Sequence, residues 1–288
     1  MNPRIRLHQL SRYAYSSAVS FSPHLLRIFP RSEPGRFLRH FQLQTNSAAD
    51  VQFRRDFFDN NVARAYYPER STELLIELTA ELELRVENAF HFLLDPHAAE
   101  YPFPYSARER ERLTPFLASV TGSEKAPALS FWSPPAGQTE TVALLLSLVS
   151  ALNEHIRYEV RPDGPSRAPV ETVQLGVGSC RDTARLLMAL LRDLGFAARL
   201  VSGYLWEPPG DDANKKHADG SFHAWTEVAL PGAGWVGLDG TNGVFCDHHF
   251  IACAVGLDAE DITPVSGRYF SDAPVDSTMD ATLRIELL

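Results

Sequence analysis

The chain has 288 residues, more than the roughly 100–200 of a typical domain, so we expect two packed units in one polypeptide. Hydrophobic residues make up 44% and charged residues 22%, a globular composition that excludes a largely disordered chain. The formal net charge is −9, and this acidic excess argues against a nucleic-acid partner, because proteins that bind phosphate backbones usually carry a basic excess.

Neither an export signal nor a membrane segment is predicted. The first residues contain no apolar stretch long enough for a signal peptide. The most apolar segment, Val142 to Leu152, has about 11 residues, whereas a helix needs about 20 to cross a bilayer. We therefore expect a soluble, cytoplasmic protein without a membrane partner.

Alternation with period two dominates the first 86 residues. Between Leu74 and Val86, apolar side chains take one face and mostly charged ones the other, which predicts a half-buried antiparallel strand. The apolar face carries Leu74, Ile76, Leu78, Ala80, Leu82, Leu84 and Val86. Shorter predicted strands cover residues 7–15, 25–29 and 37–45. Residues 1–87 are therefore predicted to form a β-rich domain that resembles a sandwich.

Helical periodicity begins near residue 105. Residues 106–117 are rich in charge and predict a helix with a solvated face. Residues 122–138 contain three prolines and predict an ordered loop, so residues 88–138 are expected to connect the two units. A second helix is predicted over residues 142–156. Its core-facing stripe consists of Val142, Leu145, Leu146, Val149, Leu152 and Ile156.

Residues 139–288 are predicted to form a mixed core. An amphipathic helix over residues 181–194 should end at Gly195. Three short strands follow. They cover residues 198–205, 223–230 and 235–239. The polar segment Glu207–Ser221 is predicted to be an exposed, mobile loop, and it precedes His223 directly, so it is placed to rim a site.

Cys180 is the first candidate for chemistry. The chain has three cysteines, Cys180, Cys246 and Cys253, which cannot all pair with one another, so each is a core residue, a metal ligand or a nucleophile. Cys180 follows the glycine-rich run 176–178 and begins a predicted helix, whose positive N-terminus favours a thiolate. The glycines also leave room for a substrate backbone. The alternative interpretation is an inert thiol at a helix start.

His223 and Asp239 lie on two strands joined by a short turn. If Leu230 pairs with Gly234, Asp239 falls opposite Trp225, and His223 lies diagonally beside Asp239 on the same face. A carboxylate in that position fixes the imidazole tautomer, and the other ring nitrogen can then face a thiol. Paired in this way, His223 is predicted to be functional and not merely structural.

The same residues resemble a known family. Residues 178–204, beginning Gly-Ser-Cys-Arg-Asp-Thr-Ala-Arg, resemble the Cys motif of the transglutaminase-like superfamily. Residues 223–228 and 235–242 resemble its His and Asp motifs, in the same order. The first domain is similar to the β-rich N-terminal domain of bacterial members. Its traces lie at residues 12–15, 24–31 and 56–60.

The resemblance implies an α+β fold, with an N-terminal β-sandwich-like domain followed by a papain-like core of helices on an antiparallel sheet. It implies Cys180 as nucleophile, His223 as base and Asp239 as the group that orients the imidazole. Such enzymes attack a carboxamide or peptide carbonyl and form a thioester, so a protein or peptide substrate and no cofactor are expected. The backbone N–H of Cys180 and the side chain of Tyr158 are candidate oxyanion donors. Trp225 and Arg181 are candidates for the substrate rim.

The chain departs from the family pattern near the nucleophile. Bacterial relatives usually carry Gln directly after the Cys and His three residues beyond it, where this chain has Arg181 and Arg185. Gly240 follows Asp239 where Pro is common. These departures leave the triad intact, and we expect the charge of Arg181 to favour the Cys180 thiolate.

Other candidate sites in the sequence fit their chemistry less well. Cys246, His248, His249 and Cys253 offer four possible zinc ligands, but their spacing fits no usual paired-cysteine pattern, so no metal is predicted. His217 is a rival base in a polar loop. Residues 176–178 lack the third Gly and the Lys of a phosphate loop. The acidic residues of segment 258–261 lack calcium-loop spacing.

Two classes of function stay open from the sequence. The first is a thiol enzyme, either a peptidase or amidase, or a transglutaminase. The second is a catalytically silent binding or scaffold protein on the same fold. Within the first class, the choice between hydrolysis and amine transfer depends on how well the site excludes water. We favour hydrolysis, because nothing visible in the sequence forms a tunnel for an amine.

Overall fold

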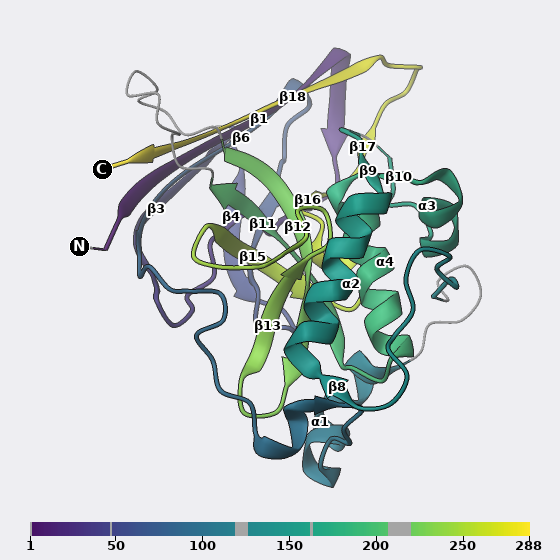
Figure 1. Cartoon of the computed structure of the whole chain (residues 1–288). Helices are drawn as coiled ribbons and strands as arrows, with labels where there is room; N and C mark the ends of the chain where they lie inside the picture. Colours follow the sequence, from purple (N-terminus) through teal and green to yellow (C-terminus); the bar gives the residue numbers. More distant parts are fainter. Residues whose placement is uncertain (1, 47, 119–125, 162–163, 207–219) are drawn as a thin grey trace, which may run out of the picture.

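The computed structural model describes residues 2–46, 48–118, 126–161, 164–206 and 220–288. The predicted α+β class is confirmed: a strand-rich N-terminal part lies against a core in which helices cover one face of an antiparallel sheet (Figure 1). His217 and most of the loop predicted over residues 207–221 lie outside the described residues.

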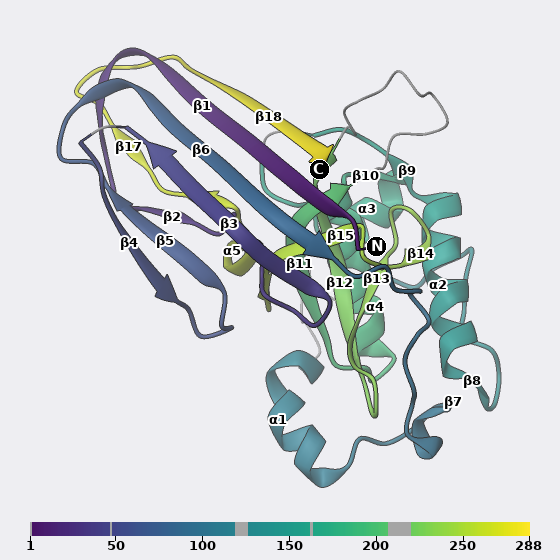
Figure 2. The ribbon, with the colours of Figure 1, turned by 90° about the vertical axis from the view of Figure 1, so that its left-hand side faces the viewer.

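Two sheets form the N-terminal sandwich. The first has the order β17-β1-β6-β3, with β18 also pairing with β1, and the second has the order β16-β2-β5-β4. Figure 2 shows the two sheets stacked face to face. Their longer strands are β1 (Arg4–Phe21), β3 (Arg36–Thr45), β4 (Asp50–Arg55), β5 (Asn61–Tyr66) and β6 (Ser71–Leu84). The short strands are β2 (His24–Leu26), β16 (Val265–Ser266) and β17 (Tyr269–Phe270).

Strand β6 shows why the alternation was informative. Its even-numbered residues from Leu74 to Leu84 are all buried between the sheets, and the odd-numbered ones are partly exposed. The last expected member of that face, Val86, is exposed, because β6 ends at Leu84 and the chain leaves the sheet. The prediction for Val86 was wrong.

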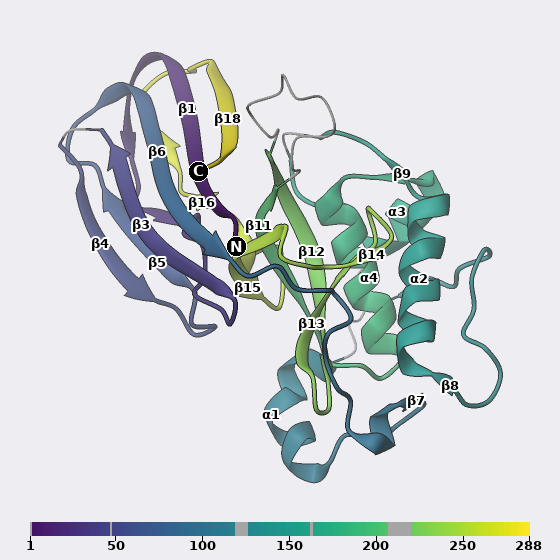
Figure 3. The ribbon, with the colours of Figure 1, turned by 60° about the vertical axis from the view of Figure 1, so that its left-hand side comes forward.

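The core is a five-stranded sheet with the order β14-β13-β12-β11-β15. Its strands are β11 (Ala198–Trp206), β12 (Gly220–Leu230), β13 (Gly234–Asp239), β14 (Val244–Phe245) and β15 (Phe250–Gly256). Helices α2 (Thr141–His155) and α4 (Cys180–Asp193) pack on one face, and the sandwich packs near the other (Figure 3). The sheet is therefore the middle layer of the molecule.

The remaining elements are short or peripheral. Helix α1 (Ala107–Leu117) has no buried residue, so the predicted solvated helix is confirmed, and it begins with a capping box between Ser106 and Glu109. The others are η1 (Pro96–Ala98), β7 (Glu100–Tyr101), β8 (Thr139–Glu140), β9 (Arg157–Tyr158), α3 (Pro169–Leu175), β10 (Val177–Gly178) and α5 (Ala259–Ile262). No helix among the described residues combines the length and the apolar character that crossing a bilayer requires.

Helix α2 is rotated slightly from the predicted phase. Leu145, Val149 and Leu152 are buried as expected, but Leu146 is 39% exposed, while Leu144 and Leu148 are buried. Helix α2 contacts β14 of the sheet and also the short strands β7 and β8, so its buried face is wider than the predicted stripe. The prediction for Leu146 was wrong.

The end of the chain returns to the sandwich. The sequence prediction grouped residues 139–288 in one core, yet β18 (Ser277–Leu287) pairs antiparallel with β1 from Tyr15 to Ile5. The side chains of β18 are mostly exposed, and Ile285 is its one buried residue. Backbone hydrogen bonding to β1 therefore places this strand, and its side-chain pattern gave no signal for it.

Ile285 provides a test of this placement. It is fully buried in the sandwich core, and it lies so close to Gly220 that a Cβ there would approach its Cδ1 to 2.5 Å. We expect Ile285→Ala to lower the free energy of unfolding by about 2–4 kcal/mol, as loss of a buried Ile side chain does. Urea unfolding measures the change. Leu287→Ala, at an exposed position of the same strand, should change it by less than about 0.5 kcal/mol. Equal effects would contradict the placement.

Backbone-directed hydrogen bonds join the sandwich to the core sheet. The buried Asn60 amide donates to the Val255 carbonyl and accepts from the Val255 N–H, both at 2.8 Å. The Tyr204 hydroxyl donates to the Ile28 carbonyl at 2.7 Å. Both N-terminal partners come from segments singled out in the sequence, residues 24–31 and 56–60. Those segments therefore attach the sandwich to strands β11 and β15 of the core sheet.

Candidate active site

Cys180 is the first residue of helix α4. Gly176, with φ of 60°, ends α3 in the left-handed conformation, and the chain turns into α4 within four residues. A Cβ at Gly178 would lie 3.1 Å from Thr172 and 3.2 Å from Asp182, so this glycine is needed for close packing of the turn. The glycines thus serve the internal geometry that sets Cys180 at the helix N-terminus, partly exposed.

A buried carboxylate holds the start of α4. Asp182 accepts hydrogen bonds from the backbone N–H of Ser179 at 2.9 Å and of Arg167 at 2.6 Å. The Arg161 guanidinium lies 3.4 Å from the same carboxylate. Asp182 was not singled out in the sequence, although its position three residues after Ser179 is that of a capping-box partner. It fixes the turn that carries the nucleophile candidate.

The β12–β13 hairpin brings His223 to Asp239. The ladder pairs Leu230 with Gly234 and Thr226 with Leu238, so the predicted register is confirmed. His223 Nε2 lies 2.8 Å from Asp239 Oδ2, and both side chains are buried. The Thr226 hydroxyl donates to the Ala184 carbonyl at 2.8 Å, which holds β12 against α4 near Cys180.

Two further donors hold the Asp239 carboxylate. The backbone N–H of Thr241 donates to Oδ1 at 2.8 Å, and the Asn242 side chain donates to Oδ2 at 2.6 Å. Asn242 belongs to the quoted Asp motif, but no role was predicted for it. The turn between them needs Gly240, because a Cβ there would lie 3.1 Å from both Leu152 and Thr183. This crowding explains the glycine that replaces the common proline.

Asn242→Ala tests the positioning of Asp239. We expect the rate at which iodoacetamide alkylates Cys180 at neutral pH to fall roughly 3–10-fold. This is less than the more than tenfold effect of losing a full hydrogen bond to a charged group, about 1.5–3 kcal/mol, because two other donors remain on Asp239. The pH profile of alkylation should also shift upward. Asn88→Ala, at an exposed asparagine, is the control. An unchanged profile in Asn242→Ala would argue against this role.

The Cys180 thiol hydrogen-bonds the His223 imidazole. Because Asp239 takes Nε2, the nitrogen on the thiol side is Nδ1. Burial raises the pKa of Cys180, but the hydrogen bond and the charge of His223, with backbone N–H groups of Ala224 and Arg181, bring the net pKa below its usual value. The structure therefore places His223 between Cys180 and Asp239, in contact with both.

The pKa shifts of His223 and Asp239 also favour the charged form of each group. Burial lowers the pKa of His223, but the hydrogen bonds and negative charges of Asp239 and Cys180 raise it to about 10. Burial raises the pKa of Asp239, yet the hydrogen bond and charge of His223, together with Asn242 and Thr241, hold it below its usual value. The arrangement thus favours a thiolate, an imidazolium and a carboxylate side by side.

Tyr158 and Arg181, the candidate oxyanion donor and a candidate rim residue, have different surroundings. Tyr158 pairs with Gly178 in the small β9–β10 sheet and is 50% exposed; burial and then the charges of Cys180 and Asp239 raise its pKa. Arg181 donates to the Arg161 carbonyl at 2.7 Å, so its side chain holds the neighbouring loop. After His223 and the backbone N–H of Ala224, the backbone N–H of Arg181 also lowers the pKa of Cys180.

Trp225 is not an exposed rim residue, so that prediction was wrong. Its side chain is 2% exposed, and its ring stacks on His223 with centroids 6.3 Å apart. Phe250 packs against both rings. Alternation along β12 places Trp225 on the same buried face as His223, where it supports the imidazole.

The four-ligand zinc arrangement is not assembled. Cys253 is buried against the sandwich, with its sulfur 3.5 Å from the Ile28 carbonyl. Cys246 packs instead beside Trp225, in another cluster. Cys246 lies in the turn before β15 and Cys253 within β15, and their side chains pack in two different clusters.

The acidic group at 258–261 forms the cap of α5: Asp258 accepts from the N–H groups of Glu260 and Asp261.

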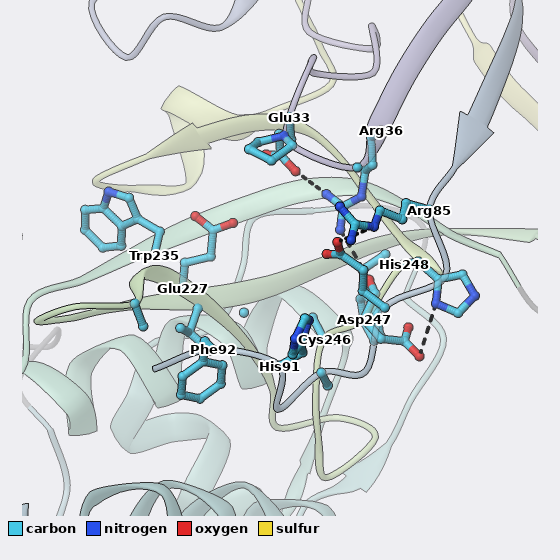
Figure 4. A pocket seen from close by; sticks show the side chains of 18 of the residues that line it. Glu33, Arg36, Arg85, His91, Phe92, Glu227, Trp235, Cys246, Asp247 and His248 are labelled. Atoms are coloured by element: carbon cyan, nitrogen blue, oxygen red, sulfur yellow. Dashed lines mark hydrogen bonds and ion pairs between the residues drawn. The ribbon is translucent and has the colours of Figure 1, made fainter. Parts of the chain in front are cut away.

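A cavity of about 430 Å³ lies between the sandwich and the core sheet (Figure 4). Its walls include Glu33, Arg36 and Arg85 from the sandwich side and Glu227, Trp235, Asp247 and His248 from the core side. Neither Cys180 nor His223 lines it. Trp225 and Phe250 separate the cavity from His223, because both rings line the cavity and contact the imidazole.

Two family models match the chain in the order that the fold displays. The model described as "Transglutaminase-like superfamily" matches residues 134–240, and that described as "Bacterial transglutaminase-like N-terminal region" matches residues 5–83. The chain belongs to the transglutaminase-like superfamily. The matched core contains the whole set Cys180, His223 and Asp239, and the matched N-terminal region coincides with the sandwich through β6.

Relatives of this transglutaminase-like chain occur in mycobacteria. An uncharacterized protein of Mycobacterium tuberculosis is 28% identical over 178 residues, which cover 60% of this chain and 56% of the relative. One of Mycobacterium leprae is 37% identical over 111 residues, 38% of each chain. The chain thus matches little more than half the length of the first of these relatives.

One solved structure shares the fold over the full length. The crystal structure described as "a Putative Cysteine Protease from Cytophaga hutchinsonii" has a TM-score of 0.69 at 15% identity. The match covers 100% of this chain and 98% of that one. At this identity the likeness establishes the shared fold, including the sandwich on the transglutaminase-like core.

Proposed function

We propose that this protein is a cysteine-dependent hydrolase of amide bonds in proteins or peptides. The observation that carries the proposal is the contact of the Cys180 thiol with an imidazole whose other nitrogen lies 2.8 Å from Asp239. A thiolate is the nucleophilic form of cysteine, and an imidazolium beside it is the acid that an amine leaving group needs. Membership of the superfamily supports thiol-dependent chemistry in general.

The reaction follows from the charges of the pair. The Cys180 thiolate attacks the carbonyl carbon, and the developing oxyanion is met by the Cys180 backbone N–H and by the Tyr158 hydroxyl. The His223 imidazolium gives its proton to the departing amine as the C–N bond breaks, which leaves a thioester on Cys180. Water then attacks the thioester while His223 takes its proton, and the acid product leaves as the Cys180 thiolate re-forms. Asp239 orients the imidazole and stabilises its positive charge.

Water is the acceptor that the site favours. Cys180 is partly exposed and Tyr158 is 50% exposed, so solvent reaches the position where the thioester forms. Amine transfer requires that the intermediate be protected from water, whose concentration is near 55 M, and for this reason transfer enzymes close their sites.

The cytoplasmic location and the domain limits at residues 87 and 138 remain predictions.

Incubation of the protein with casein and a labelled primary amine tests the choice of acceptor. We expect new peptide termini or released ammonia to exceed amine incorporation, and both products to be absent with Cys180→Ala. Incorporation in excess of hydrolysis would replace the hydrolase by a transglutaminase. If neither product forms, and Cys180 reacts with iodoacetamide no faster than an ordinary thiol, the scaffold alternative is favoured.

A further inference from the structure

The turn between β14 and β15 carries a cluster of metal-ligating side chains outside the candidate active site. It consists of three consecutive residues, Asp247, His248 and His249, each partly buried. One ligand atom from each lies within 4.8 Å of the others. Asp247 and His248 line the cavity between the sandwich and the core sheet, where Figure 4 shows the two side chains turned toward each other. We name this cluster the turn triplet.

The hydrogen bonds of the turn triplet leave one imidazole nitrogen unpaired. His249 Nδ1 lies 2.9 and 3.0 Å from the two oxygens of Asp247. His248 Nδ1 is 3.9 Å from Asp247 Oδ2, too far for a hydrogen bond, and it is buried with no hydrogen-bond partner among the described residues. Leaving such a nitrogen buried and unpaired destabilises the folded chain, because the nitrogen loses its hydrogen bond to water and gains none in return. A group that binds a lone pair next to a carboxylate would remove this cost.

The donor set fits a transition-metal ion better than a hard cation. Imidazole nitrogens suit zinc, copper and nickel, whereas calcium and magnesium prefer sets made entirely of oxygen. With metal–ligand distances near 2.0–2.1 Å, two ligands of a tetrahedral zinc ion lie about 3.3 Å apart. His249 Nδ1 and His248 Nδ1 lie 3.0 Å and 3.9 Å from the same oxygen, Asp247 Oδ2, on either side of that value.

We propose that Asp247, His248 and His249 bind one zinc-class divalent ion through a carboxylate oxygen and two Nδ1 atoms. The ion replaces the Nδ1–H of His249 that now faces Asp247, and that proton moves to Nε2, so the imidazole stays neutral. Three protein ligands leave a fourth tetrahedral position for water or for a group from the cavity. Neither Cys246 nor Cys253 takes part, unlike in the zinc arrangement considered from the sequence.

The surroundings of the turn triplet suggest a structural effect of the ion. The Arg36 guanidinium of the sandwich donates to the Asp247 carbonyl at 3.2 Å. The Trp206 ring lies 5.3 Å from the His249 ring and 6.5 Å from the His248 ring, centroid to centroid. An ion that rigidifies this turn therefore holds the contact between the sandwich and the core. It binds the folded chain, so it raises the unfolding temperature with metal concentration.

Metal binding is tested on the full, untagged chain carrying Cys180→Ala, which removes the thiol of lowered pKa as a competing zinc ligand. After chelation and dialysis, we expect calorimetry to show one equivalent of Zn²⁺ bound. Co²⁺ should give ligand-field absorption without a sulfur-to-cobalt charge-transfer band, because the turn triplet contains no thiolate. A sulfur band, or no binding at micromolar Zn²⁺, would overturn the proposal.

Variants at the turn separate this site from general affinity of histidines for metal. His248→Ala and His249→Ala should each weaken Zn²⁺ binding by more than the roughly 10–100-fold cost of losing a supporting hydrogen bond. His91→Ala, at a histidine on the same cavity wall, should leave affinity unchanged. Asp247→Asn keeps the oxygen that caps the turn and serves if an alanine variant fails to fold. Equal affinity in the parent, His248→Ala and Asp247→Asn would overturn the proposal.

Discussion

Cys180→Ala should reduce amide hydrolysis by at least about 10³-fold while leaving the fold intact, because removal of the nucleophile from a triad eliminates the covalent route. The side chain is small and partly exposed, so the substitution leaves no large cavity. Rates with a fluorogenic peptide amide, compared with the urea unfolding midpoint of the same preparation, separate loss of chemistry from loss of structure.

Alkylation identifies the same sulfur without a substrate. In the unmodified chain, iodoacetamide near neutral pH should label Cys180 alone, since the pKa of Cys180 is lowered by His223 whereas burial raises the pKa of Cys246 and of Cys253. Cys246→Ala is the matched control and should keep both the labelling and the hydrolysis. Labelling that is spread over the three thiols, or is as slow as for an ordinary thiol, would count against an activated Cys180.

The arrangement of Cys180, His223 and Asp239 could be predicted because short-range rules determine it. The turn at residues 231–234 sets the pairing of Leu230 with Gly234, and period-two alternation then puts His223 and Asp239 on one face. Likewise, the residue that begins an amphipathic helix can be located from the sequence, so Cys180 was placed at the N-terminus of α4. The alternation of β6 predicted the sandwich in the same way.

The supporting residues could not be predicted because their partners are distant in the chain or specific to a turn. The buried Asp182 carboxylate pairs with Arg161 and Arg167, which lie 15 to 21 residues earlier in the chain. No hydrophobic periodicity in the sequence links these arginines to Asp182. Asn242 acts only because the turn at Gly240 folds it back onto Asp239. Trp225 looked like a rim residue because alternation does not show which face of a middle sheet is covered by a second domain.

The return of β18 to the sandwich was missed for a related reason. Its side chains are mostly exposed on an edge strand, and their pattern resembles a polar tail. The cavity between the sandwich and the core was equally invisible, since its walls come from segments as far apart as Glu33 and Asp247. Sequence patterns therefore located the triad and the layers, while the interface between the layers required the structure.

Asp239→Asn should reduce amide hydrolysis roughly 10²–10⁴-fold and narrow the pH range of activity from both sides. Without the carboxylate, burial lowers the pKa of His223 from its value of about 10, so the imidazolium is lost at lower pH. A neutral imidazole no longer lowers the pKa of Cys180, so the thiolate forms only at higher pH. The window in which thiolate and imidazolium coexist begins at the Cys180 pKa and ends at the His223 pKa, and these two values approach each other.

The pH dependence of Cys180 alkylation distinguishes this coupling from simple misfolding. In the unmodified chain the rate should reach its plateau below the usual thiol pKa, and in Asp239→Asn the midpoint should move upward. Asp193→Asn, an exposed carboxylate at the end of α4, should change neither the midpoint nor the rate of hydrolysis. If Asp239→Asn loses activity with an unchanged midpoint, Asp239 orients the imidazole without tuning its charge, and the thiolate at Cys180 must be attributed to the helix N-terminus and to the backbone N–H groups of Arg181 and Ala224.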